Sequence, residues 1–185
     1  MGCGNIPPES EIRLALSSDI RGFDPVRAVD VRSGKIVSLV YDNLVHFGDS
    51  TEIIPGIASH WDISGDGKEY RFSLRKNALF HDGNPVTAKD VVRSFKRILD
   101  PEILSPQSWM FTRIEGAVEF MDGNSPFVNG LIAENDSALT IKLKSPFSPF
   151  IQYLAMPSSA IINYRNIPYT WVRIIFTRHS TTTIN

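Results

Sequence analysis

The sequence predicts an α/β chain in which two antiparallel hairpins form a sheet that one amphipathic helix covers. Residues 70–75 alternate between apolar and polar side chains, which is the period of a strand with one buried face. A second hairpin of this character is expected at residues 128–144. Between these stretches, apolar residues recur at helical spacing from residue 88 to residue 99. Strand patterns that flank a helical pattern indicate a sheet with a packed helix.

The first hairpin is expected to pair residues 61–63 with residues 70–75. Gly65-Asp66-Gly67 lies between the two strands and supplies residues that tolerate the positive φ of a tight turn. The alternation places Tyr70, Phe72 and Leu74 on one face of the second strand. We therefore expect this face to be buried.

The helix has a predicted start and a predicted end. Asp82-Gly83 forms a turn ahead of it, and Thr87 can cap its first turn together with Asp90. Pro101 disfavours helical geometry in the residue before it, so the helix should end there. The apolar faces of strands and helix form the predicted core, which consists of Trp61, Tyr70, Phe72, Leu74, Val91, Phe95, Ile98, Ile141 and Leu143.

Composition and charge exclude several classes of function. The chain has 185 residues, of which 42% are hydrophobic and 21% charged, as in an ordinary globular chain of one or two domains. Its net charge is −1, with Lys and Arg scattered, whereas phosphate binding needs a concentrated basic face. Nucleic acid is therefore not an expected partner. The apolar runs are short and interrupted, so none is expected to span a membrane.

No catalytic or metal-binding arrangement stands out in the sequence. There is no Gly-x-Ser-x-Gly nucleophile turn, and no glycine-rich segment has the spacing of a phosphate loop. The histidines have no three- or four-residue spacing that would suit zinc, and there is one cysteine. The histidines are His46, His60, His81 and His179. We therefore expect neither an enzyme nor a bound cofactor or metal.

The order of motifs between residues 58 and 97 is the most specific feature of the chain. This segment contains Ala58-x-x-Trp61, Asp66-Gly67-x-x-Tyr70-x-Phe72, Asp82-Gly83-x-Pro85-Val86-Thr87 and Ser94-Phe95-x-Arg97. Phe23-Asp24-Pro25 precedes it, and Asp100-Pro101 follows it. In this order the motifs resemble the N-terminal portion of the extracellular solute-binding proteins, family 5, which serve peptide-importing ABC transporters. The resemblance covers about residues 11–164.

The resemblance implies part of a two-lobed clamp of the periplasmic-binding-protein type II kind. The implied part is a portion of lobe I with an antiparallel-sheet subdomain, and the second lobe is absent. Three regions are expected: a tether at residues 1–10, the N-terminal part of the solute-binding domain at residues 11–164, and an aberrant tail at residues 165–185. A frameshift or truncation accounts for this tail better than the alternative, a β-strand with a polar end.

Two segments are implied to face the ligand. Proteins of this kind hold an extended peptide between their lobes through strand-like backbone hydrogen bonds. The first segment is the loop after the first strand, which includes Val29, Asp30, Val31 and Arg32. Gln107 and Trp109 follow Ser105-Pro106 and form the second. Trp109 could instead pack under a loop. Asp30 is not expected to bind a peptide's amino group, because the family's acidic partner lies in the absent lobe.

Cys3 could be the lipid-modified cysteine of a bacterial lipoprotein, since a small residue precedes it and a polar stretch follows. An unpaired surface thiol is the alternative. The resemblance implies export to the periplasm or the outer face of the cytoplasmic membrane, possible anchoring through the Cys3 lipid, and ABC permease subunits as partners.

The implied function is therefore peptide binding for an ABC importer, exercised by an N-terminal fragment of the full protein. Two alternatives remain. The first is a member of the same superfamily that binds nickel, haem or an opine. The second is a truncated remnant without a function.

Overall fold

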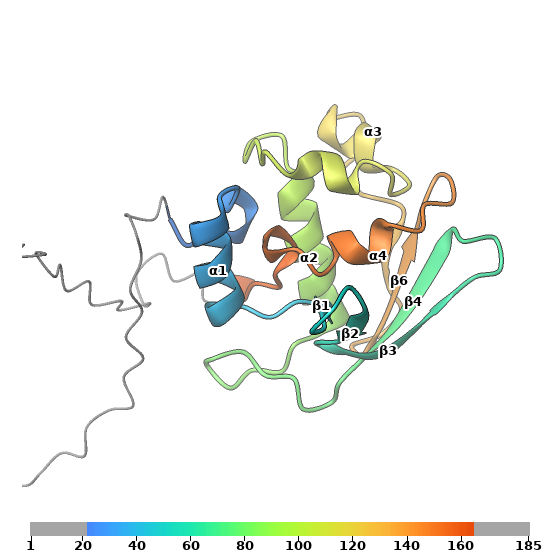
Figure 1. The fold of residues 1–185 in the computed structure, drawn as a ribbon. Helices are drawn as coiled ribbons and strands as arrows, with labels where there is room; N and C mark the ends of the chain where they lie inside the picture. Colours follow the sequence, from blue (N-terminus) through green and yellow to red (C-terminus); the bar gives the residue numbers. More distant parts are fainter. Residues whose placement is uncertain (1–21, 165–185) are drawn as a thin grey trace, which may run out of the picture.

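The computed structural model describes residues 22–164 (Figure 1). The predictions for Cys3, for the tether and for the tail after residue 164 lie outside these residues. Among the described residues, no helix combines the length and the apolar character that crossing a bilayer requires.

A four-stranded antiparallel sheet forms one layer of the fold, and both predicted hairpins are present in it. Its strand order is β3 (Ala58–Ile63), β4 (Glu69–Leu74), β6 (Ala138–Lys142) and β5 (Leu131–Ala133). Gly67 has a φ of +69° in the turn between β3 and β4, as the tight turn requires. Strands β1 (Val45–Phe47) and β2 (Ile53–Pro55) pair separately.

Helix α2 (Ala88–Leu99) crosses the molecule beside this sheet (Figure 1). The predicted capping box is confirmed: the backbone N–H of Thr87 donates to the Asp90 carboxylate at 2.9 Å. The apolar face of α2 packs into the core, where the Phe95 ring lies 5.0 Å from the ring of Phe111.

The predicted core is buried, with one exception. Trp61 is only partly buried, although it packs against the core. It lies on β3, at the edge of the sheet, where no strand covers its outer side.

Short elements complete the described fold. They are η1 (Pro25–Arg27), α1 (Val31–Val40), η2 (Ser108–Phe111), α3 (Ala117–Met121), α4 (Phe150–Tyr153) and η3 (Pro157–Ser159). Helix α1 contacts η3, and the Asn43 side-chain amide donates to the carbonyls of Leu154 and Met156 at 3.1 and 2.7 Å.

The second face of α2 is polar, yet Asp90, Ser94 and Arg97 on it are buried. This face binds the segment that returns at residues 160–164. The Ser94 hydroxyl accepts from the Ile162 N–H at 3.0 Å, and the Tyr164 hydroxyl donates to the Arg93 carbonyl at 2.9 Å. The Ile161 N–H donates in turn to the Asp42 carbonyl at 2.9 Å, so the outgoing and returning chains are joined there.

Tyr164 makes this attachment sensitive to alkaline pH. Burial raises the pKa of its hydroxyl above the ordinary value of 10.0. Below pH 10 the Tyr164 hydroxyl is neutral in the folded and in the unfolded chain. Above pH 10 this hydroxyl ionises first in the unfolded chain, so the free energy of unfolding falls as pH rises. We expect the thermal midpoint of the natural chain to fall more between pH 8 and pH 11 than that of Tyr164→Phe. Equal falls in the two proteins would contradict this prediction.

Candidate functional site

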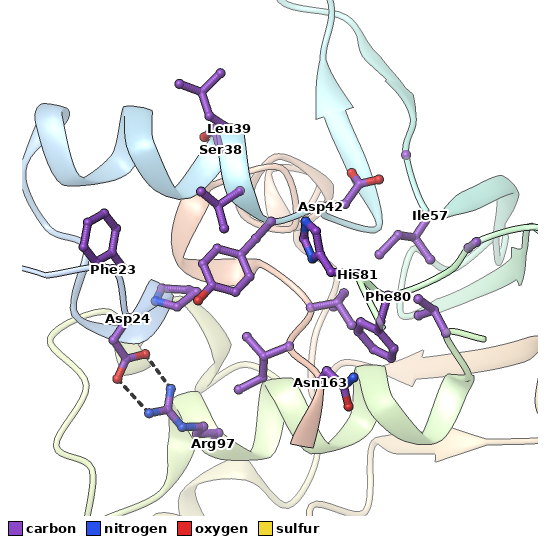
Figure 2. Close-up of a pocket in the computed structure, with 18 of the residues that line it drawn as sticks. Phe23, Asp24, Ser38, Leu39, Asp42, Ile57, Phe80, His81, Arg97 and Asn163 are labelled. Atoms are coloured by element: carbon purple, nitrogen blue, oxygen red, sulfur yellow. Dashed lines mark hydrogen bonds and ion pairs between the residues drawn. The ribbon is translucent and has the colours of Figure 1, made fainter. Parts of the chain in front are cut away.

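A pocket of about 1530 Å³ opens where the chain enters and leaves the described body (Figure 2). Gly22 and Asn163, which stand close to the two limits of the described residues, both line it. Other walls come from the end of α1, from the loop before α2 and from Arg97 on α2. The pocket therefore lies between the N-terminal segment with α1 and the sheet subdomain.

Several polar and charged side chains of this pocket contact one another in pairs. Both Nη atoms of Arg97 donate to the Asp24 carboxylate, at 2.6 and 2.7 Å (Figure 2). His46 Nε2 lies 2.6 Å from an oxygen of Asp42. The Asn163 amide donates to Asp82 at 2.8 Å.

Apolar side chains also line this pocket, including Phe23, Leu39, Ile57 and Phe80. Burial raises the pKa of Tyr41 in the same wall. Within residues 22–164, no group of three or more His, Cys, Asp or Glu side chains could hold a metal ion. The lining of this pocket thus combines apolar side chains, against which a ligand could pack, with paired polar side chains.

The first predicted ligand segment is partly helical, so the expectation of a loop through residue 32 is wrong. Val29 lines the pocket, but Val31 and Arg32 form the first turn of α1, where Val31 is 89% exposed. Asp30 starts the helix, because its carboxylate accepts from the backbone N–H groups of Arg32 and Ser33 at 3.1 and 3.0 Å. The hydrogen bonds that the backbone N–H and the hydroxyl of Ser33 donate to this carboxylate lower the pKa of Asp30.

The second predicted segment lies next to the pocket rather than in its wall. Gln107 precedes η2, and Trp109 within η2 is 57% exposed, with its ring edge-on to Tyr153 at 5.4 Å. Of the residues around it, Pro106 lines the pocket. The indole is therefore open to solvent, while the neighbouring Met110 is buried.

Two hydrogen bonds connect the two predicted ligand segments just before each begins. The buried Ser105 hydroxyl donates to the Val26 carbonyl at 2.7 Å. Arg27 donates to the Ile103 carbonyl at 3.1 Å. Residues 29–32 and 107–109 are thus held on one side of the molecule, although the chain separates them widely.

Comparisons with known proteins show the family to which the chain belongs. Residues 52–178 match the family described as bacterial extracellular solute-binding proteins, family 5 Middle. The chain is 33% identical over 150 residues to the periplasmic murein peptide-binding protein of Escherichia coli, covering 80% of this chain and 28% of that protein. It is 29% identical over 156 residues to a probable deoxycholate-binding periplasmic protein of the same organism, covering 83% of this chain and 29% of that protein.

Solved structures are similar over the same part of the chain. The Escherichia coli murein tripeptide binding protein matches with a TM-score of 0.74 and 32% identity, covering 79% of this chain and 29% of that one. The substrate-binding domain of an oligopeptide ABC transporter from Bacillus anthracis matches with a TM-score of 0.73 and 30% identity. This match covers 77% of this chain and 28% of that one.

The chain spans less than a third of the length of these relatives, so its fold is part of a type II periplasmic-binding-protein fold. On the match of residues 52–178 and the identity to the murein peptide-binding protein, this chain belongs to family 5 of the bacterial extracellular solute-binding proteins.

Proposed function

We propose that this chain is part of the substrate-binding component of an ABC importer and that its ligands are peptides. The observation that carries the proposal is the relationship to the murein peptide-binding protein over 80% of the chain. The similarity to the substrate-binding domain of an oligopeptide ABC transporter supports the same class of ligand and a permease as partner.

The candidate ligand contacts are residues 29–32 and residues 107–109. The first group follows η1 and includes the Asp30 cap and the first turn of α1, and the second presents the open face of Trp109. Ordered segments lose less conformational entropy on binding than flexible ones, which favours affinity. An aromatic face and backbone groups suit a peptide, which offers both side chains and amides.

The chain alone should bind peptides weakly. It covers 28% of the murein peptide-binding relative, and an extended peptide between two lobes gains most of its contacts only when both lobes meet. Hydrogen bonds that remain open to water contribute little net free energy.

An NMR titration of the 185-residue chain with a tripeptide tests the proposal. We expect shifts of the Trp109 indole N–H and of the amides of residues 29–32, with a Kd weaker than about 1 mM. Trp109→Ala should weaken the binding, whereas Phe127→Ala, at another exposed aromatic residue, should not.

Other outcomes of this titration would replace the proposal. Submicromolar binding would show that no further part of the protein is needed. Shifts with deoxycholate, nickel, haem or an opine, and none with peptides, would identify a different ligand class. If the chain folds but responds to none of these ligands, it would be a truncated remnant without a function.

We further propose that the parent protein is exported and that a lipid on Cys3 holds it at the membrane. The proposal rests on Gly2-Cys3 in the sequence and on the periplasmic relatives. Each buried methylene of an acyl chain contributes about 0.8 kcal/mol to membrane binding. A fatty-acid probe should label the bacterially expressed precursor, and Cys3→Ser should remove the label. Equal labelling of both proteins would reject the anchor.

A further inference from the structure

We propose that the ion pair between Asp24 and Arg97 is a positioning element, which fixes residues 29–32 relative to the sheet subdomain. The role of residues 29–32 as ligand contacts rests on the proposed function. The pair itself does not touch the ligand in this proposal and acts through the backbone that follows Asp24.

The geometry of the pair fixes orientation as well as distance. Arg97 donates through Nη1 and Nη2 to the two oxygens of Asp24, at 2.6 and 2.7 Å, across 73 residues of sequence. Such a two-point, charge-assisted contact restricts the rotation of both groups. The Arg97 side chain is 9% exposed and that of Asp24 23%, so water screens the contact little.

One end of the pair is rigid. Arg97 lies in the last turn of α2, and its neighbours Ile98 and Leu99 are among the most deeply buried side chains. The core therefore sets the position of the guanidinium, which in turn determines where Asp24 can lie.

The other end of the pair, Asp24, caps the turn that leads to the ligand segment. The Asp24 carboxylate also accepts from the Val26 N–H at 3.3 Å and so starts η1, which ends at Arg27. The contacts of the 103–105 loop to η1 keep this turn in place. Asp30, the third residue after η1, caps α1. Val29 therefore lies between η1 and this cap, Val31 and Arg32 form the first turn of α1, and the ion pair determines where the segment begins.

A role in positioning also agrees with the energetics of buried ion pairs. The cost of removing two charges from water offsets much of their attraction, so such a pair contributes little net stability. Removing one partner takes this opposite charge away from the other in a partly buried site, and the N-terminal segment would then shift.

Hydrogen exchange of the full 185-residue chain tests the pair without any ligand. Asp24→Asn and Arg97→Met should each raise exchange at residues 23–40 by at least about tenfold, while β4 and β6 exchange as before. The double variant should raise it no further than either single change, because the two residues act as one unit. Arg93→Met is the matched control, on the same helix but half exposed, and should leave residues 23–40 unchanged.

Two results would overturn the proposal. The first is unchanged exchange at residues 23–40 in both single variants. The second is an equal rise at residues 23–40 and in the sheet, which would indicate general destabilisation.

The tripeptide titration separates this inference from the proposed function. If both hold, Asp24→Asn should abolish the shifts at residues 29–32 and retain the shift of the Trp109 indole. If the natural chain shows no peptide shifts, the proposed function fails, while hydrogen exchange still decides whether the pair positions the segment.

Discussion

The packing of helix α2 against the antiparallel sheet is the interaction on which the other contacts depend. Its apolar face belongs to the main core, where α2 contacts β5 and η2 and the Phe95 ring lies against that of Phe111. Its polar face carries Arg97 and Ser94, which bind the N-terminal segment and the returning segment. Because helix α2 contacts the core with one face and these segments with the other, it adds polar contacts to two chain segments from which Val26 and Ile161 also enter the core.

This arrangement relates the fold to the candidate site. The N-terminal segment continues into residues 29–32, and the loop after α2 continues into residues 107–109, so both candidate ligand segments begin next to the C-terminal end of one helix. The pocket lies beside them, where the chain enters and leaves the described body. Binding proteins need ligand groups held in place before the ligand arrives, because ordering them later lowers affinity.

Local patterns in the sequence predicted the sheet hairpins, the boundaries of α2 and its capping box, because alternation, helical spacing and caps each act over a few residues. Trp61 was expected in the core, but strand order, which alternation does not reveal, left it at an edge. The motif with Asp24 was visible, yet its partner Arg97 lies 73 residues away and only the folded chain joins them. The capping role of Asp30 was also missed, since residues 29–32 were expected to form a loop.

Native-state hydrogen exchange of the natural chain in increasing denaturant tests the central role of α2 most directly. If both faces of this helix organise the molecule, the amides of residues 92–98 should exchange only through global unfolding, together with those of β4 and β6. The amides of α1 should exchange earlier, because this helix depends on contacts that α2 holds in place. Exchange of the α2 amides at lower denaturant than those of β4 and β6 would contradict the account.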